Sequence, residues 1–426
     1  MKLILVQGVF AAVILALPTI LFSQTGVSFS GDLRVRAEAR QNADFNSQLG
    51  DQAVFVAQRA RATLEWQFPE HLQALLQIQD ARLWGEEGST NRALNNTDLH
   101  QAYFDVEKLF GKSLVLRVGR QQLAFGNERL VGKYDWDQAG RAFDAARLTW
   151  GEAGQKIDFW LAQNRNKNAT GINSNQEFMG AYFATQRLYK TTAEVYAMAV
   201  LDDRDFPIGS TTGKSLFLIA TGARLAGKLH ERWHYDLEGV YQFGDHGDLK
   251  VQAFGMAVEG RWLVARRYAP TVSVSYVFGS GDSNPFDEKL GTLSALFPSI
   301  HEHLGAMDYV SWSNIAATVA AFELRPARGL ALQSQWHYFQ LAHGNDAWYG
   351  AQGFNFDRRS EIFLPALPGE SIVLGSEIDL SCSYTVRERI QLYCGLSRFF
   401  PGGFVKAGNP EADASDWGFL SLQMHF

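Results

Sequence analysis

Apolar and polar side chains alternate with a period of two through much of this chain, and no other feature limits the fold as strongly. The stretch QRARATLEWQF, residues 58–68, is the clearest example: Ala60 and Trp66 share one phase, and Arg59 and Arg61 share the other. Successive side chains of an extended strand point to opposite faces, so this segment is a strand with one apolar and one charged face. Such a strand fits either a soluble β-sandwich or a membrane barrel whose apolar face meets lipid.

The same alternation predicts eighteen strands and no helix beyond the first 23 residues. The predicted strands lie near residues 29–40, 53–68, 71–84, 98–107, 113–122, 142–150, 155–164, 178–187, 191–201, 215–227, 232–244, 249–262, 270–279, 312–324, 329–341, 372–385, 388–400 and 415–426. Links after even-numbered strands are short, and links after odd-numbered strands are mostly long, with 245–248 as the exception. This regular difference is typical of outer-membrane barrels, which have short periplasmic turns and long extracellular loops. We therefore predict an all-β fold: a transmembrane antiparallel β-barrel of about 18 strands.

The N-terminus predicts export. Lys2 precedes the apolar run LILVQGVFAAVILALPTILFS, which ends at Ser23. A charged start, an apolar middle and a polar end are typical of a secretory signal peptide. We expect residues 1–23 to be this peptide and residues 24–426 to be the barrel, located in the bacterial outer membrane. An uncleaved membrane anchor is the alternative.

Composition and motifs argue against several other classes of protein. The net charge of −6 is too small to indicate a nucleic-acid partner. Two cysteines cannot form a disulfide scaffold or a four-cysteine zinc site, and His301 and His303 lack the i, i+4 spacing of a hydrolytic zinc site. The chain has no Gly-x-Ser-x-Gly element, Walker loop or dinucleotide fingerprint. We therefore expect no enzymatic activity, no cofactor and no metal.

Arginines dominate the charged phase of several predicted strands, and guanidinium groups bind carboxylates bidentately. Arginines in a water-filled lumen would select anions. The candidates on the inward phase are Arg34, Arg36, Arg59, Arg61, Arg117 and Arg147. Further candidates flank or lie in the link 123–141, which we expect to fold into the lumen or over its mouth: Arg120, Arg129, Arg141 and Trp136, a residue that could stack on sugar rings. The alternative is that these arginines brace the wall by pairing with carboxylates such as Asp32, Glu38, Glu65, Asp105 and Asp144.

Two features concern the last three strands. Pairing Val386 with Ile390 places Cys382 opposite Cys394, both on the lipid phase. Opposed residues can be close enough for a disulfide in an oxidising compartment, so either a disulfide or two reduced thiols is possible. The chain ends in an apolar alternating strand with Phe426 as its last residue. We expect this end to be the signal that outer-membrane insertion machinery recognises.

Three stretches carry a resemblance to a known family: QDARLWG (79–85), LRVGRQQLAFGNERLVGKYDWDQAGRAFDAARL (116–148) and GSGDSNPFDEKLGTLSALFPSIHEHLGAMD (279–308). They resemble the alginate export family of outer-membrane barrels. The resemblance implies a monomeric barrel of eighteen strands with an arginine-rich constriction for an anionic polysaccharide. The expected partners are outer-membrane lipid, that polysaccharide and the insertion machinery, and a periplasmic export complex is a further candidate.

Our main hypothesis is thus a channel that passively moves an anionic polysaccharide or oligosaccharide, such as an alginate-like polyuronate. A porin for small anions or sugars is the first alternative. A barrel enzyme or an adhesin is an alternative of another class. The enzyme would need a Ser–His pair, and His100 with Ser113 is the nearest candidate.

Overall fold

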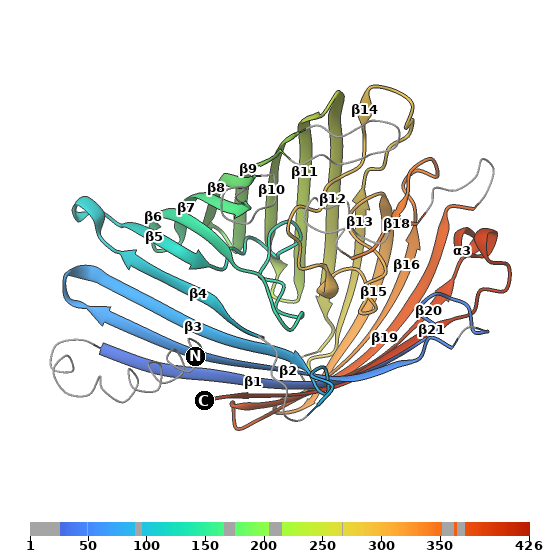
Figure 1. Cartoon of the computed structure of the whole chain (residues 1–426), viewed down its shortest axis with the longest axis horizontal. Coiled ribbons are helices and arrows are strands. Elements are labelled where there is room, and N and C mark those ends of the chain that lie inside the picture. The colour runs from blue at the N-terminus through green and yellow to red at the C-terminus, as the bar shows by residue number, and fades with distance from the viewer. Residues whose placement is uncertain are drawn as a thin grey trace.

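Eighteen strands among the described residues form one closed antiparallel β-barrel in this computed structural model (Figure 1). The structure describes residues 26–48, 50–89, 96–165, 175–203, 215–265, 267–351, 362–363 and 371–426. The strands of the wall are β1 (Gly26–Gln41), β2 (Ala53–Phe68), β3 (Leu72–Leu83), β4 (Thr97–Val106), β5 (Leu114–Gln121), β6 (Phe143–Glu152), β7 (Gln155–Arg165), β8 (Gln176–Leu188), β9 (Thr191–Asp202), β10 (Leu216–His230), β11 (Trp233–His246), β12 (Leu249–Leu263), β13 (Thr271–Gly279), β15 (Ile315–Ala327), β16 (Leu330–Gln340), β19 (Val373–Val386), β20 (Ile390–Pro401) and β21 (Ser415–His425). The predicted fold class is confirmed, strand by strand.

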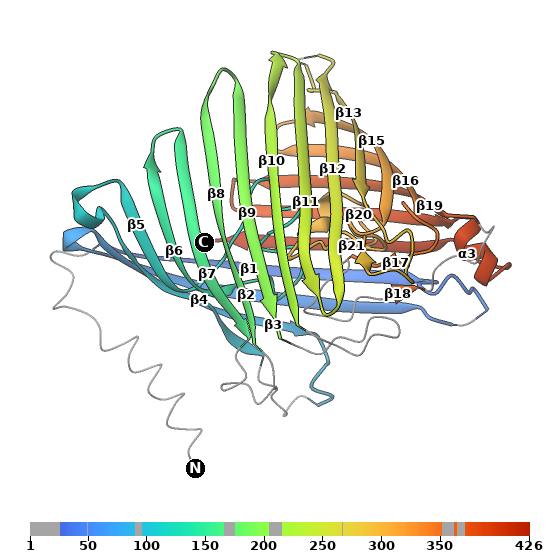
Figure 2. The ribbon, with the colours of Figure 1, turned by 90° about the horizontal axis from the view of Figure 1, so that it is seen from above.

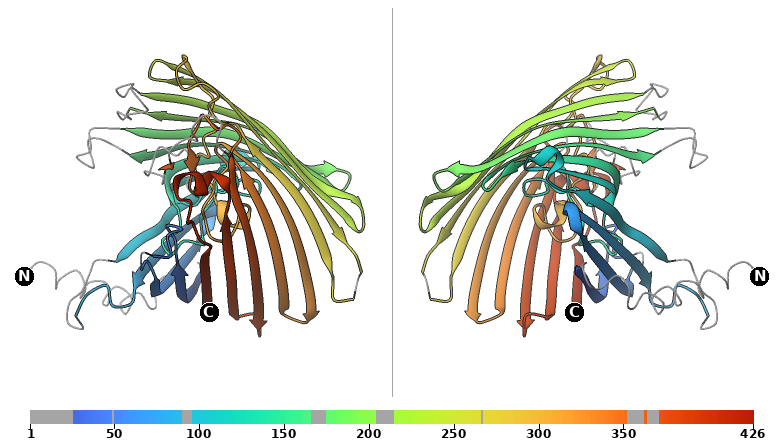
Figure 3. Two further views of the ribbon diagram at one scale, coloured as in Figure 1. Left: turned by 90° about the vertical axis from the view of Figure 1, so that its right-hand side faces the viewer. Right: turned by 90° about the vertical axis from the view of Figure 1, so that its left-hand side faces the viewer.

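The wall closes because its last strand pairs with its first. Each wall strand pairs antiparallel with the wall strands before and after it, and β21 pairs with β1 from Asp32↔His425 to Gln41↔Asp416. Figure 3 shows the red C-terminal strands lying beside the blue N-terminal strands. A closed wall leaves no unpaired strand edge, so every strand of the wall has hydrogen-bonding neighbours on both sides.

The two rims of the barrel differ as the link lengths predict. One rim, here called the short-turn rim, carries tight connections such as η1 (Pro69–His71) and η2 (Leu109–Gly111). The opposite long-loop rim carries the longer links, and Figure 2 shows the strands running between the two rims. The predicted exception also holds, because only residues 247 and 248 separate β11 from β12 at the long-loop rim.

A few short elements lie in the long links and were not predicted. They are β14 (Lys289–Leu290), η3 (Ile300–Glu302), β17 (Trp348–Tyr349), β18 (Ile362–Phe363) and α3 (Gly403–Gly408). The helix α3 differs from the expectation of no helix, because six residues are too few for a helical period to be visible in the sequence. In the part of the chain that the structure describes, no helix is both long and apolar enough to cross a membrane.

The outer surface of the wall is apolar and the inner surface carries the polar side chains. On β21, Leu420 and Leu422 are 58% and 46% exposed, whereas Ser421 between them is 5% exposed. On β2, Arg59 and Arg61 are buried, and Phe68 on the other phase is exposed. This inversion of the usual soluble pattern means that the outer face meets a non-aqueous medium.

The buried apolar core lies inside the barrel, where one inward-folded link packs against inward-facing residues of the wall. Loop 280–314, which joins β13 to β15, contributes the fully buried side chains of Leu293, Ile300, Leu304 and Trp312. These side chains belong to one cluster with inward-facing residues of the wall, such as Phe178. The lumen therefore contains folded chain near the long-loop rim, which places specific loop residues against specific parts of the wall.

Candidate functional site

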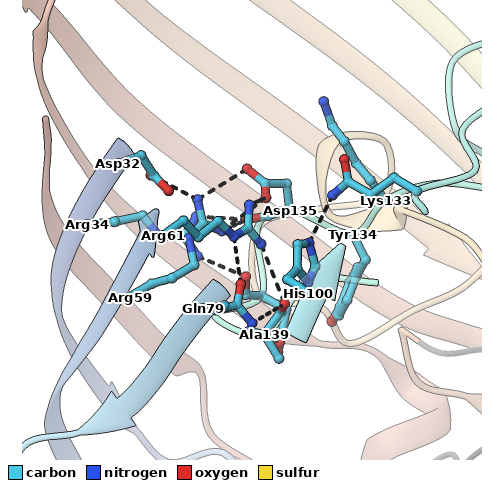
Figure 4. A network of polar contacts seen from close by, with 12 residues as sticks. Asp32, Arg34, Arg59, Arg61, Gln79, His100, Lys133, Tyr134, Asp135 and Ala139 are labelled. Atoms are coloured by element: carbon cyan, nitrogen blue, oxygen red, sulfur yellow. Dashed lines mark hydrogen bonds and ion pairs between the residues drawn. The ribbon is translucent and has the colours of Figure 1, made fainter. Parts of the chain in front are cut away.

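Loop 122–142, which joins β5 to β6, lies against the inner faces of β1 and β2 (Figure 4). Arg34 of β1 donates from Nη1 to the carbonyl oxygen of Asp135 (2.7 Å) and from Nη2 to that of Asp137 (2.8 Å). Arg36 donates from Nη1 to the carbonyl oxygen of Trp136 (2.8 Å). The two guanidinium groups thus satisfy three consecutive backbone carbonyls of the loop. The structure thus confirms that this link folds inward, as predicted.

One loop carboxylate joins two arginines of β2. Asp135 Oδ1 accepts from Nη1 of Arg61 (2.7 Å) and from Nη1 of Arg59 (3.0 Å). Arg59 also contacts Asp32 of β1 (3.2 Å), and Arg61 donates from Nε to Gln79 of β3 (2.6 Å). Burial opposes ionisation of Asp135, but the positive charges of Arg59 and Arg61 outweigh it and hold the pKa of Asp135 below its ordinary value.

The four arginines of β1 and β2 form what we call the arginine cluster: Arg34, Arg36, Arg59 and Arg61. All four are at least nine-tenths buried beneath the loop. Their carboxylate partners are Asp32, Glu38 and Asp135. Among the residues that the structure describes, Arg34 contacts only carbonyl and amide oxygens and no carboxylate. Four guanidinium groups therefore face three carboxylates, and the cluster carries an excess of positive charge.

Trp136 does not present a free ring to the lumen. The guanidinium carbon of Arg36 lies 4.0 Å from its ring centroid. The His301 ring from loop 280–314 stacks on it at 3.9 Å with planes 9° apart. Two groups this close to one centroid must occupy opposite faces of the ring. Neither face is therefore open to a sugar, contrary to the stacking role predicted from the sequence. Trp136 instead joins the two inward loops.

The two loops hold each other at several further points. Val131 and Phe297 form an isolated parallel bridge. Arg141 donates from Nη1 to the carbonyl oxygens of Gly132 (3.1 Å), Phe297 and Pro298 (3.0 Å), so this predicted pore residue ties loop 122–142 to loop 280–314. Because the sequence gives no sign of contacts between residues about 160 positions apart, this role was not predicted.

Loop 280–314 is also fixed to the wall, through a buried acidic group that sequence reasoning missed. The backbone N–H of Met307 donates to Oε1 of Glu377 (2.9 Å), and that of Ala306 donates to Oδ2 of Asp379 (3.4 Å). His337 of β16 lies 2.9 Å from the same Asp379 oxygen. The available signal was the alternation of Glu377 and Asp379 on the inward phase of β19.

The other predicted arginines are paired along the wall or the loop. Arg117 donates to both oxygens of Asp105 (2.7 Å each) and lies over the Tyr103 ring, and Arg147 contacts Asp158 (2.9 Å). Loop residue Arg129 contacts Asp236 and Glu238 across the lumen (3.8 and 3.5 Å). The wall-bracing alternative therefore describes the contacts of Arg117 and Arg147.

The placement of Arg120 does not fit the pore-lining role predicted for it. Arg117 and Gln121 take the inward phase of β5, and Gln121 is fully buried. Alternation then turns Arg120 to the outer face, where it contacts Asp144 (3.3 Å) and Asp98 (3.8 Å). Nearness to the loop suggests a pore-lining position for Arg120, but the phase of the strand decides to which side of the wall its side chain points.

A polar cavity of about 740 Å³ occupies the other side of the lumen, near the short-turn rim. Its walls are the inner faces of β9 to β13, β15 and β16, and Asn127, Arg129, Glu302 and His303 of the two loops lie above it. His303 donates from Nε2 to the carbonyl oxygen of Asn127 (2.8 Å). Burial, aided by the charge of Arg129, lowers the pKa of His303 to about 3, so this imidazole is neutral at physiological pH.

The remaining candidates concern cysteines, metals and catalysis. The predicted register is confirmed, because Cys382 pairs with Cys394. Both cysteines are free thiols in this structure.

No group of three or more metal-ligating side chains occurs among the described residues. His100 lies in the first half of β4, and Ser113 directly precedes β5. Because Ala102 pairs with Arg120 and Val106 with Leu116, the two residues lie at opposite ends of one hairpin. The Ser–His pair of the enzyme alternative does not form.

Comparison with known proteins decides the family. The model of the family described as alginate export matches residues 26–419, nearly the whole chain. The chain belongs to the alginate export family. As a member of this family with a closed barrel, it is an outer-membrane channel of a bacterium, and its apolar outer face contacts membrane lipid. The short-turn rim is the periplasmic rim, and the long-loop rim is extracellular.

Solved structures of porins share the fold at low identity. Pseudomonas aeruginosa OpdO is 16% identical, with a TM-score of 0.60 over 94% of this chain and 97% of its own. P. aeruginosa OccK2 (OpdF), solved in complex with glucuronate, is 12% identical, with a TM-score of 0.58 over 94% of this chain and 98% of its own. P. aeruginosa OpdK, solved with vanillate, is 11% identical, with a TM-score of 0.57 over 94% and 98%. No curated protein matched the alginate export chain described here.

Proposed function

We propose that this channel passively moves an anionic polysaccharide or oligosaccharide of the polyuronate type, and that the arginine cluster recognises its carboxylates. The observation that carries the proposal is the excess of guanidinium groups in the cluster, with Arg34 bound only to neutral oxygens. Guanidinium groups remain charged at any working pH and pair bidentately with carboxylates. The description of the family as alginate export supports the same substrate class.

Asp135 suggests how the cluster works. Its carboxylate sits between Arg59 and Arg61 at distances of 3.0 and 2.7 Å, which is the arrangement a uronate carboxylate would adopt. A substrate carboxylate can therefore exchange with Asp135 and keep both guanidinium groups paired. Exchange avoids leaving a buried charge unpaired, a state that costs several kcal/mol. Each step remains reversible, as passage through a channel requires.

A porin for small anions or sugars is the second candidate, and one observation favours it. Loops 122–142 and 280–314 fold into the lumen and pack against each other, which reduces the space for a long chain. Two structural neighbours were solved with small carboxylates, glucuronate and vanillate. Conductance block by uronate oligomers of increasing length separates the two candidates, because a small-anion porin would lose its response beyond one or two units.

The remaining partners are proposed on the same basis. We expect a monomer in the membrane, assembly by the outer-membrane insertion machinery, and contact with a periplasmic export complex at the short-turn rim. Nucleic acid is not an expected partner, because the net charge is −6.

Ion selectivity in planar bilayers tests the role of the cluster. Under a salt gradient, the unmodified channel should prefer anions, and Arg59→Ala with Arg61→Ala should reduce the anion-to-cation permeability ratio severalfold. Arg398→Ala is the matched control, because Arg398 lies on the outward phase of β20 and is paired with Asp416 (2.8 Å). Cation preference in the unmodified channel would overturn the proposal. An unchanged ratio in the double variant would do the same, since the arginines would then only brace the wall.

A further inference from the structure

We propose that the cavity beside the periplasmic rim is a binding site for a short acidic saccharide segment, separate from the arginine cluster. The inference rests on the proposed function for its substrate class. The cavity has a volume of about 740 Å³, within the roughly 300–1,000 Å³ that is usual for ligand sites. Its lining includes Lys190 at the turn between β8 and β9 and Lys228 near the end of β10. These positions belong to the short-turn rim, so the cavity is reached from the periplasm.

Two lysines give the cavity a local excess of positive charge. The backbone N–H of Lys228 donates to the carbonyl oxygen of Lys190 (3.0 Å), so the two residues are direct neighbours. In the described part of the chain, neither ammonium group has an ion-pair partner, and Lys190 Nζ lies 5.0 Å from the Tyr189 ring centroid. Adjacent like charges repel each other unless an anion lies between them. The pair is therefore suited to a carboxylate of the ligand.

Two of the three carboxylates that line the cavity are paired with arginines. Asp236 contacts Arg224 (2.5 Å), and Glu259 contacts Arg261 (2.7 Å). A third carboxylate, Glu302, lies on the loop above. With Arg129 and Arg261 added to the two lysines, four cations line the cavity against three carboxylates. An anionic ligand is thus favoured over a cationic one.

The opposite wall offers neutral hydrogen-bonding groups that suit sugar hydroxyls. Ser273 and Ser275 of β13 and Gln333 and Gln335 of β16 line the cavity. Among the described residues, none of these four side chains has a hydrogen-bond partner in the protein. Four polar side chains that face one cavity and are not engaged by the protein are available to a ligand. Lysines on one side and amides and hydroxyls on the other together match a uronate, which carries one carboxylate and several hydroxyls per sugar.

Location gives the site a role distinct from that of the cluster. The cluster lies beneath loop 122–142 against β1 and β2, whereas the cavity lies below both loops against β9 to β13, β15 and β16. A chain end that arrives from the periplasm meets the cavity first. Binding in the cavity raises the local concentration of this chain end below the loops, before its carboxylates reach Arg59 and Arg61.

Calorimetric titration of the full-length purified protein with a uronate tetrasaccharide tests the site. Lys190→Gln with Lys228→Gln should weaken binding at least tenfold, and Lys228→Arg should retain it. Lys108→Gln with Lys112→Gln is the matched control, because these lysines lie at the turn between β4 and β5 on the same rim and do not line the cavity. The control should bind within twofold of the unmodified protein. A second variant, Gln333→Glu with Gln335→Glu, places negative charge on the opposite wall and should also weaken binding.

Equal affinity of the lysine variant and the control would overturn the inference, as would equal binding of a neutral tetrasaccharide of the same length. Reversal potentials of the lysine variant separate this failure from failure of the proposed function. If the lysine variant still prefers anions and binds the uronate as tightly as the unmodified protein, the cavity is not the binding site. The proposed role of the arginine cluster is then retained. If the unmodified channel shows neither anion preference nor uronate binding, the proposed function fails as well.

Discussion

At the scale of single residues, the position of loop 280–314 depends on a glycine. Gly305 has a φ of +90°, which side chains rarely adopt, and a Cβ at this position would lie 2.8 Å from the carboxyl group of Glu377. The same carboxylate accepts the N–H of Met307. Glycine is therefore required at position 305, both because of the backbone conformation and because the loop approaches β19 closely.

Gly305→Ala should loosen this attachment. We expect a loss of about 1–3 kcal/mol from backbone strain, in addition to displacement of the loop from Glu377. Gly408→Ala is the control, because a Cβ there meets nothing within 4 Å. Urea unfolding in lipid vesicles, followed by tryptophan fluorescence, measures the difference. Equal stability of the two variants would contradict the role assigned to Gly305.

The charge of Asp135 leads to a second prediction at this scale, which concerns the ion selectivity of the channel. Asp135→Asn should raise anion preference, because Arg59 and Arg61 lose their shared carboxylate. The pKa of Asp135 is lowered in the folded protein, so the ionised pairing is fully present above the ordinary pKa of about 3.9 and is lost as pH falls through the lower folded value. Selectivity should therefore stay constant from pH 8 to pH 5. A steep change near pH 6 would show that another group controls it.

At the scale of elements, the seam between β21 and β1 depends on the last residue. Phe426 donates its N–H to the carbonyl oxygen of Gly31 (3.0 Å) and accepts from the N–H of Gly31 (2.8 Å). Its ring lies over Gly31, where a Cβ would come within 2.5 Å of it. The terminal residue thus extends the closing strand pair by two hydrogen bonds.

Deletion of Phe426 should reduce assembly in the outer membrane, since the barrel loses these bonds and the expected signal for the insertion machinery. Phe426→Tyr should assemble normally, because its ring and backbone are kept. Quantification of the heat-modifiable folded form in outer-membrane fractions provides the readout. Normal levels of the truncated chain would disprove our interpretation of the terminal strand.

The hairpin of β19 and β20 allows a test of its cysteines. Cys382 and Cys394 are paired in register, with Leu380 opposite Leu396 as the next pair on the same face. Because the outer membrane borders an oxidising compartment, the two free thiols of this structure should be convertible to a disulfide. Maleimide labelling of the denatured protein should find fewer reactive thiols before reduction than after it. Equal labelling would mean that both cysteines stay reduced.

At the scale of the whole molecule, the barrel begins where the predicted signal peptide has ended. Residues 1–23 lie outside the described residues, and β1 starts at Gly26. We expect cleavage after Ser23, within a few residues. Mass spectrometry of the protein from outer membranes should find the mature N-terminus there. A mature chain that retains Lys2 would indicate an uncleaved anchor instead.

The sequence alone determined the strands, their number and the identity of the two rims, because alternation and turn length are local properties that each segment carries by itself. It also determined the register of Cys382 and Cys394, since a tight turn fixes the pairing of its own hairpin. Only the tertiary structure decided that Trp136 is covered on both faces, that Arg141 joins two loops, and that Glu377 holds loop 280–314. These contacts join residues about 70 to 165 positions apart, and local patterns contain no information about which distant groups will share the closed lumen.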